Sequence, residues 1–207
     1  MAVSTTDSRP QRTRLSRELR MEQTLGVAHA LFAERGYAPV TMDEVARAVG
    51  VTKPLLYNYF GNKERLYLAC MEPAGDALVA AVVGAVARTE TPEAALRAGI
   101  HAFFEFVDRD RASWRVLFDE TLPSEGGIAS RVGEYRARML ELVEAALLAQ
   151  PSPAPPLHVE ALSVALLGAA EALVRWWLRG EALTARATAE LLIATVEPGL
   201  RPRSAGS

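Results

Sequence analysis

The sequence predicts an all-α protein of about nine helices, with a small N-terminal helix-turn-helix domain and a larger C-terminal helical bundle. Two observations support this class. Half of the 207 residues are hydrophobic but only 7% are aromatic, and the many Ala and Leu residues favour helices over strands. Apolar residues also recur at steps of three and four, whereas alternating runs of β-branched residues are absent.

The first helix is expected over residues 17–35, with Gly36 as its stop. Asn62 is placed to cap a longer helix that joins the N-terminal head to the body, with a bend at Pro73. Breaks rich in Pro, Gly and charge divide the rest, and the segment 151–156 is a stiff proline-rich connector. The helices expected after the helix-turn-helix cover residues 62–86, 91–108, 112–120, 128–146, 157–179 and 184–197.

The stretch 41–60, TMDEVARAVGVTKPLLYNYF, predicts two short helices joined by a tight turn. Thr41 and Glu44 have the spacing of a capping box, and Gly50 supplies a position where positive φ is cheap. Thr52 is placed to cap the second helix, which is so short that packing must hold it. This is the geometry of a helix-turn-helix, whose second helix enters the major groove of DNA.

The same region resembles the DNA-binding domain of TetR-type (tetracycline-repressor-like) transcriptional regulators. The matching pieces are LFAERGY, TMDEVARAVGVTK, LYNYF and NKERLY, in the family's order and spacing over about residues 17–68. Pro54 stands where the family often has Gly, and Asn62 where it often has Ser. The resemblance implies a DNA-binding regulator whose body binds an inducer and whose last two helices form a four-helix dimer interface.

The charge distribution agrees with a head that contacts DNA. Residues 1–65 carry ten Arg or Lys against seven acidic residues, whereas the remainder carries thirteen against eighteen. Only the head therefore has the positive excess expected where phosphate is bound.

Within the head, helix N-termini and the second short helix supply the residues expected to meet DNA. Backbone N–H groups at helix N-termini attract phosphate, and Leu56 and Phe60 are expected to face inward, which leaves the other side of their helix for DNA. The expected DNA-binding residues are Thr41, Thr52, Lys53, Pro54, Leu55, Tyr57, Asn58 and Lys63.

These residues differ in what they offer to a base pair. Lys53 and Asn58 have hydrogen-bonding patterns suited to guanine and adenine edges, whereas Pro54 and Leu55 suit a thymine methyl group. Phosphates are an alternative target for Lys53 and for Tyr57.

The helix expected over 157–179 carries two apolar stripes. We expect the stripe that contains Leu166 and Trp176 to face the body core, and the stripe that contains Leu167 and Val174 to meet its copy in a second subunit. A central helix buried on all sides in a monomer is the alternative. The expected dimer contacts are Leu167, Ala170, Val174, Trp177 and Leu191.

Aromatic side chains crowd the acidic body. Most of them are expected in the core, but a bundle lined by aromatics with a few polar groups is also how small-molecule pockets are built. Glu171 and Arg175, four residues apart, are interpreted as a stabilising pair within one helix rather than as a pocket or interface bridge. The candidate pocket residues are His101, Phe104, Trp114, Phe118, Tyr135, Met139 and Trp176.

Other function classes have little support. There is no phosphate-binding glycine loop, GxSxG or HExxH motif, the three histidines fall in different helices, and there is one cysteine, so we expect no catalytic residues, metal site or cofactor. The N-terminus lacks an apolar signal core, which predicts a cytoplasmic protein without a membrane partner.

The function predicted is a homodimeric repressor released from a palindromic DNA operator by a small lipophilic effector. The alternatives are a helical-bundle binding protein or enzyme with a basic docking domain, and a nucleoid-type DNA binder without an effector. The expected divisions are a disordered basic arm, the helix-turn-helix domain, an effector-binding and dimerisation domain, and a disordered tail, over residues 1–14, 15–61, 62–198 and 199–207.

Overall fold

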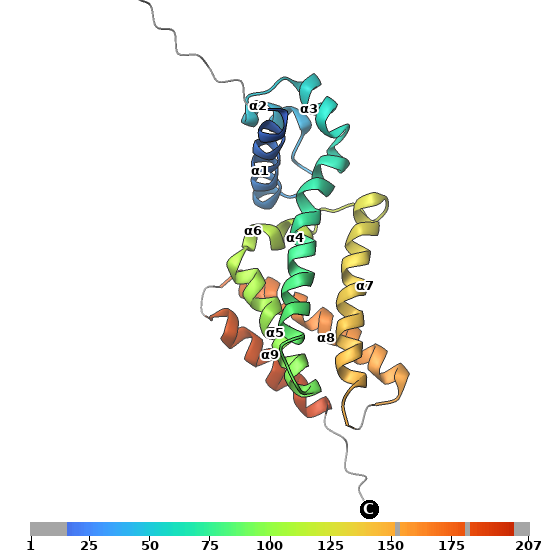
Figure 1. The fold of residues 1–207 in the computed structure, drawn as a ribbon. Helices are drawn as coiled ribbons and strands as arrows, with labels where there is room; N and C mark the ends of the chain where they lie inside the picture. Colours follow the sequence, from blue (N-terminus) through green and yellow to red (C-terminus); the bar gives the residue numbers. More distant parts are fainter. Residues whose placement is uncertain (1–15, 152–153, 181–182, 201–207) are drawn as a thin grey trace, which may run out of the picture.

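The computed structural model describes residues 16–151, 154–180 and 183–200, with side chains up to residue 197. Within these ranges the chain forms nine helices and no strand, as predicted. The arm over 1–14 and the tail beyond residue 200 lie outside the described residues. The helices are α1 (Arg17–Arg35), α2 (Met42–Val49), α3 (Lys53–Phe60), α4 (Lys63–Val86), α5 (Pro92–Arg109), α6 (Arg111–Leu117), α7 (Gly127–Leu148), α8 (Pro156–Trp177) and α9 (Ala185–Leu200) (Figure 1).

Helices α1, α2 and α3 form the head, which lies at one end of α4 (Figure 1). The predicted bounds of α1 are confirmed, and the Ser16 hydroxyl caps it by accepting from the N–H of Leu19 at 3.2 Å. Phe32 of α1, Val45 of α2 and Leu56 of α3 are buried together in the hydrophobic core. Because α2 and α3 have eight residues each, this shared core rather than helix propensity holds them.

Helix α4 runs from the head through the body (Figure 1). The side chain of Asn62 caps it by accepting from the N–H of Arg65 at 2.8 Å, as predicted, and the helix continues past Pro73. Its buried side, which includes Tyr67, Met71 and Leu78, packs against α1, α5, α6 and α7. A single helix therefore belongs to the cores of both head and body.

The remaining helices complete the body around α4. Helix α5 packs between α4 and α9, α7 packs on α8, and the short α6 packs against both α1 and α4. Four C-terminal ends differ from the prediction by two or three residues: α6 stops at Leu117, α7 continues to Leu148, α8 stops at Trp177, and α9 extends to Leu200. Such ends depend on packing and capping in the folded chain, which apolar periodicity does not specify.

Candidate DNA-binding surface and effector cavity

The turn between α2 and α3 has the predicted geometry. The Thr41 hydroxyl accepts from the N–H of Glu44 at 3.2 Å, and the Glu44 carboxylate accepts from the N–H of Thr41 at 2.8 Å, which completes a capping box. Gly50 has φ 75° and ψ 33°, a left-handed conformation in which a side chain would be strained. Thr52 is the N-cap residue of α3, but its side chain makes no capping hydrogen bond, contrary to the prediction.

The outer face of α3 is open to solvent. Leu56 and Phe60 are buried, as predicted, so the opposite side of the helix points away from the head core. Leu55 is half-buried at the edge of this face. The exposed candidates for DNA contact on α3 and its N-cap are Thr52, Lys53, Pro54, Tyr57 and Asn58.

The two lysines of the chain have different surroundings. Lys53 is exposed and forms an ion pair with Asp43 at 2.7 Å, which raises its pKa. Lys63 is half-buried: its Nζ donates to the Ala38 carbonyl at 3.0 Å and lies 4.2 Å from the centre of the Tyr37 ring. Burial lowers the pKa of Lys63 despite nearby carboxylates. Asp43 was not predicted as a partner, because nothing in the spacing of residues 43 and 53 requires their side chains to meet.

Polar contacts fix the head to the body at the C-terminal end of α1. The N–H of Tyr37 donates to the Asp119 carboxylate, and the N–H of Ala38 donates to the Thr121 hydroxyl at 3.1 Å. On α4, the buried Tyr67 hydroxyl donates to the Val116 carbonyl at 2.6 Å. The body loop after α6 therefore hydrogen-bonds directly to the segment that leads into α2.

An apolar cavity of about 50 Å³ lies inside the body, between α4, α5, α7 and α8. It is larger than the space one water needs, about 15 Å³, but it offers a water no polar partners. Such a space suits a hydrocarbon group. Its walls are formed by Val82, Val86, Ala95, Leu96, Gly99, Ile100, Phe103, Met139, Leu142, Val143, Ala146, Leu166, Leu167 and Ala170.

A second, smaller cavity of about 10 Å³ shares Phe103, Met139 and Leu167 with the first. Arg136 and Glu171 line it as a bidentate ion pair, with Nε of Arg136 3.0 Å from Oε1 of Glu171. The other lining residues are Leu78, Leu117, Phe118, Val132 and Tyr135.

This ion pair corrects the prediction that Glu171 pairs with Arg175. Glu171 turns into the protein, where its side chain is only 4% exposed and is neutralised from α7 by Arg136. A buried carboxylate needs such a partner, and the partner need not lie on its own helix. Arg136 lies three residues before Met139 on α7, so it falls on the same side of the helix as a predicted pocket residue, which is the one sequence signal that pointed to it.

The candidate pocket residues are only partly brought together. Met139 lines both cavities, Tyr135 and Phe118 line the smaller one, and Trp114 lies with Phe118 on a separate groove between head and body. Phe104 is fully buried core and lines none of these spaces.

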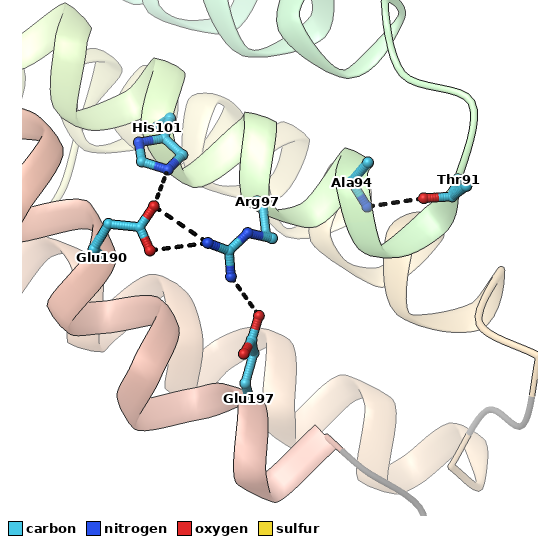
Figure 2. Close-up of polar contacts among 6 residues, drawn as sticks. All are labelled: Thr91, Ala94, Arg97, His101, Glu190 and Glu197. Atoms are coloured by element: carbon cyan, nitrogen blue, oxygen red, sulfur yellow. Dashed lines mark hydrogen bonds and ion pairs between the residues drawn. The ribbon is translucent and has the colours of Figure 1, made fainter.

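Two further pocket candidates lie outside the cavities. His101 faces α9, where its Nε2 lies 2.9 Å from Oε1 of Glu190, and Arg97 bridges Glu190 and Glu197 in the same cluster (Figure 2). Trp176 is 52% exposed. Neither side chain lines one of the cavities described above: His101 helps hold α9 on α5, and Trp176 lies on the surface.

The stripes of α8 were also wrongly assigned. Leu167, Ala170, Val174 and Trp177, the predicted dimer contacts on this helix, are buried within the protomer's own core, whereas Leu191 on α9 is 49% exposed, as an interface needs. The face that α8 presents to solvent is a third one, with Leu157 75% and Val164 56% exposed. Its apolar and small members are Leu157, Ala161, Val164, Ala165, Gly168, Ala169, Ala172 and Trp176, and the exposed polar residues His158 and Glu160 lie at its N-terminal end.

Helices α4 and α8 are long and apolar enough to cross a membrane by length and composition alone. Half of the apolar window of α4 is buried, but only 39% of that of α8, so α8 carries more uncovered apolar surface. Among the described residues, no group of three or more His, Cys, Asp or Glu side chains is placed to hold a metal ion.

Known proteins resemble both parts of the chain. Residues 25–70 match the bacterial regulatory proteins of the tetR family, and residues 92–197 match the tetracyclin repressor-like C-terminal domain. The chain is 32% identical over 168 residues to the HTH-type transcriptional activator FasR of Mycolicibacterium smegmatis, over 81% of this chain and 76% of FasR. It is 31% identical over 110 residues to the HTH-type transcriptional regulator BetI of Brucella anthropi, over 52% of this chain and 57% of BetI.

Solved structures share the fold. A TetR-like transcriptional regulator from Rhodococcus sp. RHA1 superposes with a TM-score of 0.77 at 30% identity, over 92% of this chain and all of that one. AibR, whose crystal structure is a complex with isovaleryl coenzyme A and operator DNA, superposes with a TM-score of 0.71 at 24% identity, over 85% of this chain and 97% of AibR.

Proposed function

Because the chain belongs to the TetR family of bacterial transcriptional regulators, we propose that it acts as a homodimeric repressor that leaves a palindromic operator when a small apolar effector binds. Members of this family bind DNA and regulate transcription. The main structural support for operator binding is the outer face of α3. This face stays open to solvent because Leu56 and Phe60 are buried on the opposite side of the helix. We assign residues 15–61 to DNA binding and 62–198 to effector binding and dimerisation, in a cytoplasmic protein.

On the DNA side, we assign phosphate contacts to the helix N-termini and base contacts to α3. Thr41 and Thr52 are the exposed N-cap residues of α2 and α3, where hydroxyl and N–H groups attract phosphate. Lys53 and Asn58 are assigned to base edges, and Pro54 and Leu55 to thymine methyl groups. Tyr57 and Lys63 would complete the phosphate contacts, Lys63 after giving up its bond to the Ala38 carbonyl.

The dimer is proposed to form through the exposed face of α8 together with Leu191 of α9. Small residues such as Ala165, Gly168 and Ala172 recur along that face at helical spacing and allow two helices to approach closely. The larger Val164 and Trp176 supply apolar area that water would otherwise cover. A second copy is the occupant that suits a family whose palindromic operators require two-fold symmetry.

The effector is proposed to occupy the apolar cavity between α4, α5, α7 and α8. The cavity is lined by side chains from four helices, two of which, α4 and α5, also contact the parts that position the head. A related fold, that of AibR, has been crystallised with isovaleryl coenzyme A, which carries a short branched acyl group. An apolar group of that kind would fit the lining residues here.

Operator binding is tested by selecting DNA that the purified protein retains from a random-sequence pool, followed by gel shift at several salt concentrations. We expect a palindromic consensus, bound by two protomers. Retention of unrelated sequences with equal affinity would refute the sequence-specific regulator. A reporter gene behind the selected operator then gives the polarity: a repressor lowers expression, whereas an increase would indicate an activator, as FasR is named.

A further inference from the structure

An exposed ion pair joins the two short helices of the helix-turn-helix. Nζ of Lys53, the first residue of α3, lies 2.7 Å from Oδ1 of Asp43 in the first turn of α2. The side chain of Lys53 is 55% exposed and that of Asp43 is 54% exposed, so the pair stands in solvent rather than in the head core. A carboxylate therefore lies directly beside the lysine that we assign to a base edge.

The partner of Asp43 is not the cation nearest to it along its own helix. Arg47 is exposed and lies four residues after Asp43 on α2, which is the usual spacing for an ion pair within one helix. Nε of Arg47 donates instead to the backbone carbonyl of Asp43, at 3.4 Å. Among the ion pairs of the described residues, the Asp43 carboxylate pairs with Lys53 alone, so it is directed across the turn to α3.

A carboxylate at this position opposes binding to DNA by charge alone. Lys53 is the only charged residue of α3, and Asp43 neutralises it. Asp43 also lies two residues after Thr41, at a helix N-terminus that we assign to a phosphate. A neutralised lysine displaces no counterion from DNA, so it adds little to the affinity that is independent of sequence. An exposed ion pair also adds little to stability, which leaves DNA recognition as the property that this pair affects most.

We propose that Asp43 is a specificity-determining residue that directs Lys53 to neutral acceptors on a base edge and away from phosphate. An ammonium group has three N–H donors, so Lys53 can keep its bond to Asp43 and still donate to N7 and O6 of a guanine. These guanine atoms carry no net charge, and the carboxylate does not repel them. A phosphate on the same ammonium would be an anion held close to a second anion, which raises its energy.

This inference rests on the proposed function, since it requires Lys53 to lie at the major groove. It is tested with the full-length protein by comparing affinity for the selected operator with affinity for unrelated DNA of the same length. In Asp43→Asn the Lys53 ammonium is free for phosphate, so unrelated DNA should bind about tenfold more tightly, about threefold for each protomer, as one exposed ion pair allows. Operator affinity should change by less than about twofold. The ratio of the two affinities therefore falls at least about fivefold, and an unchanged ratio would overturn the inference.

The salt dependence of binding to unrelated DNA gives a second readout. Each lysine that contacts a phosphate adds about 0.9 to the slope of log affinity against log salt concentration. The slope should therefore be steeper by about two in the Asp43→Asn dimer, because one Lys53 of each protomer joins the phosphate contacts. Asp43→Glu restores the charge and should return the slope to that of the wild type. A slope that does not change in Asp43→Asn would show that Lys53 avoids phosphate for another reason.

A double variant separates this role from a direct repulsion between Asp43 and DNA. If Asp43 acts through Lys53, then Asp43→Asn changes neither the affinity ratio nor the salt slope when Lys53→Gln is already present. Equal effects with and without Lys53→Gln would overturn the inference, because the carboxylate would then act on DNA by itself. Asp108→Asn controls for net charge, since it removes the carboxylate of another exposed ion pair, with Arg111 at 3.3 Å, from the body.

The selection of an operator by the wild-type protein keeps this outcome separate from that of the proposed function. Failure to select any sequence would reject the regulator and, with it, this role of Asp43. A palindrome selected by the wild type, together with an unchanged affinity ratio in Asp43→Asn, would reject the role of Asp43 alone. Circular dichroism and sizing chromatography confirm that each variant is folded and has the oligomeric state of the wild type.

Discussion

Helices α3 and α8 each leave one face open to solvent, but the two faces are chemically opposite. The open side of α3 carries Lys53, Tyr57 and Asn58. The open side of α8 carries Val164 and Trp176 among small residues. A polar face is stable in water and can bind and release a polyanion, whereas an exposed apolar face is more stable when a partner covers it.

The contrast also explains why one helix was easier to interpret from sequence. In α3, Leu56 and Phe60 are four residues apart, apolar and large enough to anchor a two-turn helix, so the opposite side was expected to be the outer one. In α8 the apolar residues cover almost the whole circumference, and periodicity does not say which face meets the core. Glu171 is charged but buried on the inner side of α8, so the polarity of a residue did not predict which face of this helix is exposed.

The largest expected effect separates the inner from the outer face of α8. Leu167→Arg buries an unpaired charge in the core, which costs several kcal/mol, roughly the whole stability of a small domain, so we expect misfolded or insoluble protein. Val164→Arg places the same charge on the exposed face and should give a folded monomer. Analytical ultracentrifugation and circular dichroism distinguish the two results, and a dimeric Val164→Arg protein would show that another face joins the subunits.

The next effect concerns α4, the helix that links the two regions. A Cβ at Gly75 would lie 2.7 Å from Cε1 of Tyr135 and closer still to two other ring atoms, so Gly75→Ala should destabilise the protein by about 1–3 kcal/mol through overpacking. Gly84→Ala in the same helix meets only the end of Arg88, at 3.5 Å, and should be neutral or gain up to about 1 kcal/mol from helix propensity. Chemical denaturation measures both, and equal midpoints would contradict the proposed clash.

Local signals account for what the sequence predicted well. The capping box of Thr41 and Glu44, the left-handed Gly50 and the bounds of α1 all depend on residues within a few positions of one another. The helix count and the head domain follow from such signals. The family resemblance added an expected function to these structural predictions. The matches of residues 25–70 and 92–197 to TetR-family domains confirm the family.

Contacts between distant residues account for what the sequence did not predict. Arg136 neutralises Glu171 from another helix, and Arg115 of α6 and Arg179 after α8 line the same groove between head and body although they lie far apart in the sequence. His101 was expected in a pocket but faces α9, since its spacing fits either side of α5. Side-chain pairing across helices is a property of the packed fold, and periodicity constrains it only loosely.

A smaller effect tests the outer face of α3. If Leu55 or Pro54 contacts a thymine methyl group, replacing thymine by deoxyuracil at one operator position should weaken binding by roughly 1 kcal/mol. The loss should vanish in Leu55→Ala if that side chain makes the contact. Gel-shift titrations over every thymine of the half-site measure it. If no position responds, base reading depends on DNA shape or on the arm that precedes α1 rather than on α3.

The smallest expected effect is the pH dependence of the α2 capping box. Hydrogen bonds from the backbone N–H of Thr41, from Arg35 and from the Thr41 hydroxyl lower the pKa of Glu44 to about 2. Because this pKa lies below the unfolded value of about 4.3, the folded head binds fewer protons than the unfolded chain. The stabilisation by Glu44 is therefore complete above about pH 4.3 and is lost as the pH falls toward 2.

Glu44→Gln isolates this contribution, because glutamine can still accept from the Thr41 N–H at the same position of a capping box but carries no charge to titrate. We expect the wild type to unfold at a higher temperature than Glu44→Gln near pH 6, and the difference to shrink steadily between pH 4.3 and 2. Glu34→Gln, an exposed carboxylate on α1, controls for the change in net charge. A wild-type advantage that stays constant down to pH 2 would mean that the Glu44 carboxylate gains nothing from its charge, and that neutral hydrogen bonds alone hold the start of α2.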